Sequence, residues 1–174
     1  MKSRDTIVIG CDHAGYGVKE FIKSLLQKMN YPVVDVGTYG RESVDYPDYA
    51  ERVASMVKER RNIKGILACG TGIGASIAAN KVPGIYAALV HDIRDARLSR
   101  QHNNANLLVL GGRPYRKKIV EKVVKAWLRS EFKGGRHRRR INKISKIEKR
   151  YLLPQKTKKQ RTQLHSSKQE TAVP

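Results

Sequence analysis

The segment GILACGTGIGASIAAN, residues 65–80, sets the pattern on which the fold depends. It begins with an apolar run, passes through glycines at alternate positions, and ends in small residues that suit a helix. A buried strand that turns through glycines directly into a helix is typical of parallel α/β sheets. We therefore expect a strand over 65–69, a tight turn, and a helix over 75–80.

Strand and helix patterns alternate on both sides of this segment. Further apolar runs predict strands over residues 6–10, 33–37, 85–90 and 106–110. Apolar residues at helical spacing predict helices around residues 18–29, 47–57, 93–101 and 114–127, the last with Ile119 facing inward, and another after Gly134 and Gly135. The alternation predicts a Rossmann-like three-layer α/β fold with a five-stranded parallel sheet, plus a C-terminal helix and a basic tail.

The charge is strongly and unevenly basic. The 174 residues include 36 Lys and Arg against 15 Asp and Glu, a formal net charge of +21. Residues 133–174 hold 14 of these cations and two of the carboxylates. We expect one domain over residues 1–152 and a disordered basic extension over 153–174, which has almost no apolar residues. A solvated tail is the favoured interpretation, and weak non-specific attraction of nucleic acid is the alternative.

Composition argues against several classes of protein. No run approaches the roughly 18 apolar residues of a membrane span, and the N-terminus lacks the apolar core of a secretory signal. The two cysteines, Cys11 and Cys69, offer no disulfide framework, and the histidines are too scattered for a metal site. These features predict a cytoplasmic protein without a metal.

Cys69 stands at the end of a predicted strand, where ligands of doubly wound sheets bind. Backbone N–H groups of the glycines after it, Gly70, Gly72 and Gly74, can converge on an anion or an oxyanion at the start of a helix. A thiol beside these groups is expected to have a pKa below the ordinary ~8.5, which would make it a usable base or nucleophile. A small buried hydrophobic residue is the alternative interpretation of Cys69.

The same glycines also permit a second interpretation. Gly70, Gly72 and Ala75 satisfy the pattern G-x-G-x-x-G/A, and Asp92 lies near the end of the next strand. A nucleotide-binding oxidoreductase or sensor would fit this pattern. The pattern lies on the third strand rather than the first, however, and the helix after it is short.

Asp12 and His13 form a second candidate group, directly after the first strand. Such a pair can bind sugar hydroxyls, move a proton or contact a phosphate. In the alternative interpretation Asp12 caps a helix and His13 is incidental. We assign the neighbouring Cys11 to packing.

Two further groups carry histidine and arginine. His102 is a candidate general acid, with Asn103 as a hydrogen-bonding orienter and Arg113 after the fifth strand. Arg136 and Arg140 are four residues apart, so on a helix they share a face and can grip one phosphate.

Five motifs together resemble the ribose-5-phosphate isomerase B family, which also contains galactose-6-phosphate isomerase subunits: GCDHAG, DYPDYA, CGTGIGASIAANK, SRQHNNANLLVLGGR and GGRHRRRI. The resemblance covers residues 7–150. It implies an isomerase of the pentose phosphate pathway that interconverts D-ribose 5-phosphate and D-ribulose 5-phosphate through an enediolate, with a six-carbon sugar phosphate as the alternative substrate. It also implies no cofactor, and a homodimer or tetramer with active sites at the subunit interface.

The resemblance implies a role for each matched residue. Cys69 would be the base that moves a proton between C1 and C2, Thr71 a proton relay, and His102 the acid that opens the sugar ring with help from Asp12. Backbone amides from Gly70 to Gly74, including Ile73, would hold the enediolate oxygen. The substrate would be held by His13, Arg113, Arg136 and Arg140 on the phosphate, and by Asn103 and Tyr46 on the sugar. A cysteine at position 69 corresponds to the branch of the family that uses a thiol rather than a glutamate base.

Overall fold

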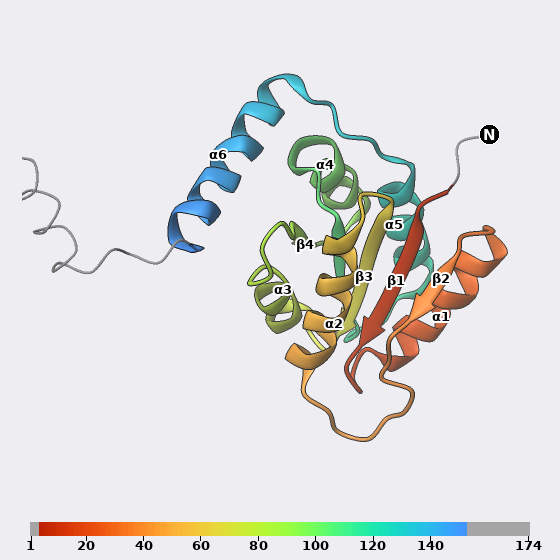
Figure 1. Ribbon diagram of the computed structural model, residues 1–174. Helices are drawn as coiled ribbons and strands as arrows, with labels where there is room; N and C mark the ends of the chain where they lie inside the picture. Colours follow the sequence, from red (N-terminus) through yellow and green to blue (C-terminus); the bar gives the residue numbers. More distant parts are fainter. Residues whose placement is uncertain (1–3, 153–174) are drawn as a thin grey trace, which may run out of the picture. The chain divides into compact units, whose positions relative to one another are not determined.

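The computed structural model describes residues 4–152 and shows a parallel sheet between two layers of helices (Figure 1). The strands β1 to β5 cover Thr6–Cys11, Val33–Asp35, Ile63–Cys69, Ala87–Leu89 and Leu107–Gly111. The helices α1 to α6 cover Tyr16–Lys28, Tyr46–Glu59, Ile73–Ala79, Ile93–Asn103, Lys117–Arg129 and Gly135–Leu152. The strand order is β2-β1-β3-β5-β4, and every pair is parallel. The predicted Rossmann-like fold with a five-stranded sheet is confirmed.

The chain divides into two compact units. The first ends at Ile141 and contains the sheet, α1 to α5 and the first turns of α6; the second begins at Asn142. The extension predicted over residues 153–174 lies outside the described residues. Among residues 4–152, no helix combines the length and the apolar character that a membrane span requires.

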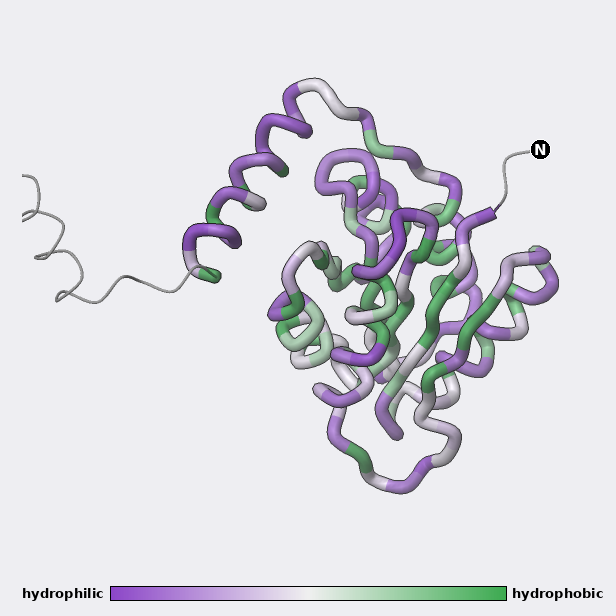
Figure 2. Tube along the Cα trace, in the orientation of Figure 1, coloured by the Kyte–Doolittle hydropathy of each residue, from purple (hydrophilic) through white to green (hydrophobic). Residues whose placement is uncertain are grey.

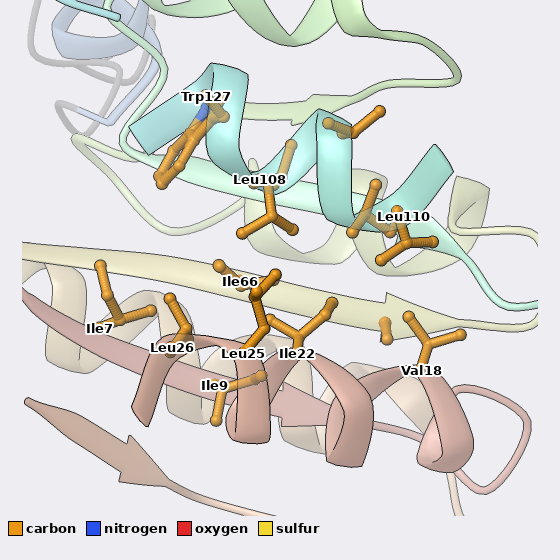
Figure 3. Packing of buried hydrophobic residues seen from close by; sticks show 14 of the residues in the cluster. Ile7, Ile9, Val18, Ile22, Leu25, Leu26, Ile66, Leu108, Leu110 and Trp127 are labelled. Carbon is orange, nitrogen blue, oxygen red and sulfur yellow. The ribbon is translucent and has the colours of Figure 1, made fainter. Parts of the chain in front are cut away.

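Side chains of each strand alternate between two hydrophobic cores, one on each face of the sheet. The core beneath α1 and α5 is built around residues such as Ile9, Leu108 and the fully buried Trp127 (Figure 3). The opposite core lies beneath α2 and α3. Because successive strand residues point to opposite faces, Cys11 belongs to the first core and Cys69 to the second. The two thiols therefore have different surroundings.

The helix after β5 differs from its prediction. α5 begins at Lys117 rather than at Pro114, and the side chain of Ile119, which was predicted to face inward, is 39% exposed. The inward face consists of Val120, Val123, Val124 and Trp127. Successive helical residues are about 100° apart, so Ile119 is turned away from Val120 toward the rim of this face.

The helix α6 is strongly basic and has a narrow apolar face. Figure 2 shows mainly hydrophilic residues along it, with apolar residues between them. Ile144, Ile147 and Tyr151 recur at three- and four-residue spacing and are exposed.

A buried ion pair joins α1 to the end of β2. The Lys19 side chain is fully buried, and its Nζ lies 2.9 Å from each carboxylate oxygen of Asp35 and 2.9 Å from the carbonyl oxygen of Thr38. The rings of Tyr16 and Tyr39 lie 5.5 and 5.0 Å from this ammonium group. These contacts anchor residues 36–45, which connect β2 to α2 along the carboxyl edge of the sheet.

The ion pair shifts the pKa values of both its members. Burial alone would lower the pKa of Lys19, but hydrogen bonds to Asp35 and Glu20 outweigh burial and raise it. Burial alone would raise the pKa of Asp35, but hydrogen bonds from Lys23 and Lys19 outweigh burial and lower it. Both groups are therefore charged in the folded protein at neutral pH.

Replacing Lys19→Met should lower the free energy of unfolding by about 3 kcal/mol, because it leaves a buried Asp35 carboxylate with one cation fewer. The loss should shrink toward acid pH. The folded-state pKa of Asp35 is depressed, so its stabilisation is present above its unfolded pKa of about 3.9 and is lost as pH falls through the folded value. Urea unfolding between pH 7 and pH 3 measures both effects.

The matched control is Lys23→Met, since Lys23 bonds a single oxygen of Asp35 and its side chain is 32% exposed. It should cost about 1 kcal/mol or less. Equal losses in the two variants would contradict the anchoring role of Lys19.

Candidate active site

Cys69 ends β3 with its side chain almost covered, only 6% exposed. The turn after β1 places the Asp12 carboxylate, which is equally buried, within hydrogen-bonding reach of the thiol. The backbone N–H groups of Gly70 and Gly72 also reach the sulfur. A thiol, a carboxylate and two amide donors therefore meet at one point.

The predicted lowering of the Cys69 pKa is wrong, because the structure raises it. Burial contributes most, and the hydrogen bond to Asp12 adds to it, since both disfavour a negative charge on sulfur. The N–H groups of Gly72 and Gly70 act in the opposite direction and do not outweigh these effects. The chain alone therefore holds Cys69 as a neutral thiol beside an acceptor carboxylate.

Gly15 allows the turn after β1 to touch the end of β3. A Cβ atom at this position would lie 2.3 Å from the carbonyl oxygen of Ala68 and 2.7 Å from the nitrogen of Cys69, which is closer than real atoms approach. Oδ1 of Asp12 accepts a hydrogen bond of 2.8 Å from the N–H of Gly15, and this bond orients the carboxylate. The turn after β5 completes the contact, since Gly112 donates its N–H to the carbonyl oxygen of Cys69 at 2.7 Å.

The glycine loop after Cys69 is covered by Tyr46. Gly72 has φ of +81°, a conformation that favours glycine, and it turns the chain into α3. A Cβ atom at Gly74 would lie 2.5–2.8 Å from three atoms of the Tyr46 side chain, so the ring of Tyr46 rests directly on this loop. Thr71 is exposed, and its Oγ1 accepts a bond of 3.3 Å from the N–H of Ile73. The predicted residues Tyr46 and Thr71 therefore lie on the same loop as Cys69.

His13 ties the turn after β1 to the loop before α2. Its Nδ1 lies 3.2 Å from the N–H of Val44 and 3.3 Å from the carbonyl oxygen of that residue. Because Nδ1 is occupied by the backbone of Val44, Nε2 is the ring nitrogen left for a ligand.

Cys11 packs in the hydrophobic core, as predicted. It is fully buried, its Sγ lies 3.8 Å from the carbonyl oxygen of Thr38, and burial raises its pKa to about 12.

A cavity of about 390 Å³ opens beside the glycine loop. Its lining includes Thr71, His91, Arg113 and the rim residue Ile119. The N–H of Arg113 donates to the carbonyl oxygen of Gly70 at 3.0 Å, so this arginine is attached by its backbone to the glycine loop. The wall of the cavity therefore has a cationic part at Arg113 and an apolar part at Ile119.

Asp92 has a structural role that does not support the nucleotide-binding interpretation. Its Oδ1 accepts a hydrogen bond of 2.8 Å from the N–H of Asp95 and caps α4. Within residues 4–152, no group of three or more His, Cys, Asp or Glu side chains is arranged to hold a metal ion.

The other predicted residues lie at the opposite edge of the sheet. Cys69 pairs with Gly111 at the carboxyl ends of β3 and β5. β5 has five residues and, at about 3.3 Å per residue, extends about 13 Å back from this pair. His102 and Asn103 end α4 before β5 begins, so they lie beyond the amino end of that strand. One chain therefore does not bring these two residues to Cys69.

Arg136 and Arg140 belong to the same edge as His102. Between them in α6 stands His137, which is buried and stacks on His102 with a centroid distance of 4.1 Å and an interplanar angle of 8°. Burial lowers the pKa of His137, and the positive charges of His102, Arg136 and Arg140 lower it further. This stack fixes the first turn of α6 against the end of α4.

The role of His137 was missed in the sequence. The sequence does carry a weak signal. His137 is the one residue in the run 136–140 whose side chain can lose its charge near neutral pH, and an uncharged side chain can be buried. Lys19 was missed as well. It falls three residues before the core residue Ile22 and so lies on the inner face of α1.

Replacing Asp12→Asn should lower the pKa of Cys69, because it removes the negative charge beside the thiol and keeps an acceptor oxygen for the N–H of Gly15. Alkylation of Cys69 by iodoacetamide at pH 7.5 should therefore become several-fold faster. Mass spectrometry of the labelled peptides separates Cys69 from Cys11, which is the internal control and should stay unlabelled. An unchanged or slower rate at Cys69 would contradict the proposed effect of Asp12.

The chain is similar to known proteins over most of its length. Residues 7–144 match the family model described as Ribose/Galactose Isomerase. Ribose-5-phosphate isomerase B of Escherichia coli is 44% identical over 144 residues, which cover 83% of this chain and 97% of that protein. The structure of Clostridium thermocellum ribose-5-phosphate isomerase B is 51% identical, has a TM-score of 0.81, and the match covers 84% of this chain and 99% of that one.

A further solved relative contains a ligand. It is ribose-5-phosphate isomerase B from Mycoplasma genitalium with bound ribulose-5-phosphate, 45% identical with a TM-score of 0.80, and the match covers 83% of this chain and 96% of that one. The family model, the identities and the shared fold all indicate the same family. The chain belongs to the ribose/galactose isomerase family.

Proposed function

We propose that the protein is an aldose–ketose isomerase that interconverts D-ribose 5-phosphate and D-ribulose 5-phosphate through an enediolate. The observation that carries this proposal is the Cys69 thiol, held between the Asp12 carboxylate and the amides of Gly70 and Gly72. Similar proteins are named ribose-5-phosphate isomerase B, and the structure of one of them contains bound ribulose-5-phosphate. Both findings support the same substrate for this protein. We place the reaction in the pentose phosphate pathway of the cytoplasm, in keeping with the free thiols of Cys11 and Cys69.

The arrangement around Cys69 supplies each proton transfer of such a reaction. Cys69 passes its thiol proton to Asp12, and the thiolate removes the proton from C2 of the open-chain aldose. The negative charge that forms on the C1 oxygen is held by the N–H groups of Gly70 and Gly72. Thr71 moves the hydroxyl proton from O2 to O1, and Cys69 then delivers its proton to C1, which gives the ketose. Asp12 finally returns its proton to the Cys69 thiolate and restores the starting state. No redox cofactor enters this balance.

Substrate binding extends to residues on both edges of the sheet. His13 and Arg113 stand near Cys69 and bind the phosphate, while Tyr46 lines the sugar. The residues of the amino edge complete the site from a second subunit: His102 as the acid that opens the ring, Asn103 on the sugar, and Arg136 and Arg140 on the phosphate. A two-fold axis that places the amino edge of one subunit against the carboxyl edge of its partner makes two identical sites.

Two features support this homodimer. The residues of the amino edge lie too far from Cys69 of their own chain to act on the same substrate. The apolar face of α6, formed by Ile144, Ile147 and Tyr151, is exposed and suits contact with another chain.

Replacing Cys69→Ala should lower kcat by about 10²-fold or more, since it removes the base. Arg136→Ala should mainly raise KM, by about tenfold, because it removes a phosphate contact. Ribulose 5-phosphate formation in the presence of EDTA provides the assay, and Arg139→Ala, another exposed arginine of α6, is the matched control with unchanged constants. Allose 6-phosphate and galactose 6-phosphate are compared as substrates. Wild-type protein inactive on all three sugars, or equal kinetic changes in the Cys69 and Arg136 variants, would contradict the proposal.

Mixing two inactive variants tests the shared site. If His102 acts on the substrate of its partner, a hybrid of a Cys69→Ala chain and a His102→Ala chain contains one intact site and one doubly altered site. Random exchange of equal amounts makes half of the dimers hybrid, so about a quarter of wild-type activity should return. Refolding the mixture from urea and measuring turnover gives the value. If activity does not return, while each variant refolded alone still forms dimers, His102 does not act across the interface.

A further inference from the structure

A second hollow lies at the amino edge of the sheet, away from Cys69. It has a volume of about 470 Å³, within the range of roughly 300–1,000 Å³ that small-molecule sites occupy. Its walls come from the end of α2, the start of β3, the segment from the end of α4 to Asn106, and the first turns of α6. The hollow belongs entirely to the first unit of the chain.

The lining of this hollow is strongly cationic. Six cationic side chains line it: Lys58, Arg60, Arg61, Lys64, Arg100 and Arg138. No carboxylate is among the residues that line it. One of the six cations, Lys64, is neutralised by a salt bridge to Asp5.

The remaining cations lack a counter-charge. In the part of the chain that the structure describes, the side chains of Lys58, Arg60 and Arg61 form no ion pair or hydrogen bond, and Arg138 contacts only the ring of Phe132. Like charges that face one concave space repel each other, and the repulsion is removed when an anion enters. Guanidinium groups bind phosphate oxygens in pairs, so several arginines favour phosphate over other anions.

One cation of the hollow is nearly buried. Arg100 lines the same hollow and is 8% exposed, with Nη1 bonded to the carbonyl oxygen of Ala105 at 2.6 Å and to Oδ1 of Asn104 at 3.3 Å. Its Nε has no hydrogen-bond partner among residues 4–152. Asp5 and Glu131 act on this guanidinium through space, without bonding it. Arg100 therefore adds a nearly buried guanidinium to the wall formed by the exposed cations.

The hollow is separate from the phosphate contacts assigned to the isomerase. Arg138 is two positions from both Arg136 and Arg140, and two helical positions are about 200° apart. Arg138 therefore points away from the face that Arg136 and Arg140 share. The other cations of the hollow come from α2, from β3, from the connection between these two elements and from α4, and none of these segments carries a residue assigned to phosphate binding.

We propose that this hollow is a second anion site, which binds a small molecule with two or more phosphate groups. A compact ligand fits better than a nucleic-acid strand, because the cations converge on one concave space rather than along a stripe. The residues that line the hollow are not among those assigned to the isomerase reaction, so the proposal can be tested separately from the proposed function.

Calorimetric titration of the full chain with inorganic pyrophosphate, in 150 mM salt, tests the proposal. Wild-type protein should bind one pyrophosphate per chain at this site. The double variant Arg60→Gln/Arg61→Gln should bind at least about tenfold more weakly, since it removes two phosphate contacts. The matched control Arg94→Gln/Arg97→Gln removes two exposed arginines of α4 outside the hollow, and its affinity should stay within about twofold. All four positions are exposed, so both variants should keep the wild-type melting temperature.

Four results would overturn the proposal. If wild-type protein did not bind pyrophosphate, the hollow would not be an anion site. Equal weakening in the two double variants would show attraction by net charge alone. Displacement of pyrophosphate by ribose 5-phosphate would place it in the substrate site. Binding of a single-stranded oligonucleotide that depends on Arg60 and Arg61, without binding of pyrophosphate, would assign the cations to nucleic acid instead.

Discussion

The active site depends on how closely three backbone turns approach each other at the carboxyl ends of β1, β3 and β5. Gly15 lies against the carbonyl group of Ala68, and Gly112 bonds the carbonyl group of Cys69, so neither turn can move outward without breaking the contact. A side chain at position 15 would push the first turn away and take the Asp12 carboxylate with it. The Asp12 carboxylate stays beside the thiol because the backbones touch. The close packing of Gly15 and Gly112 therefore determines which side chains can meet at the carboxyl ends of the strands.

The same sheet also separates the residues of the site into two groups. Parallel strands gather every carboxyl end at one edge, which favours a single ligand site there. A helix that precedes a strand must end at the other edge, so His102 at the end of α4 cannot reach the ligand site of its own chain. The stack of His102 on His137 places the first turn of α6, and with it Arg136 and Arg140, at this second edge. In the homodimer that we propose, a symmetric partner resolves this conflict, because each chain then offers both edges.

The order of strands and helices could be predicted because each element carries its own local pattern. The five apolar runs, the helical spacings and the glycine turn after Cys69 are all readable within a few residues. Two of the errors concern features that depend on residues distant in the sequence. The raised pKa of Cys69 comes from burial and from Asp12, 57 positions earlier, whereas the amide groups that suggested a lowered value are adjacent. Lys19 was missed for the same reason, since its partner Asp35 lies on another element.

A neutral thiol at rest is compatible with a role as base, and the charge balance explains why. The substrate brings a phosphate dianion, and the pocket already contains the Asp12 carboxylate. A permanent thiolate would add a third negative centre in a buried place, at high electrostatic cost. In the mechanism that we propose, the thiol proton passes to Asp12, so one negative charge moves to sulfur, and the removal of the C2 proton then moves this charge to the enediolate oxygen. Each transfer relocates a single charge toward the amides of Gly70 and Gly72, so the raised pKa of the free chain keeps the number of charges in the site constant throughout the reaction.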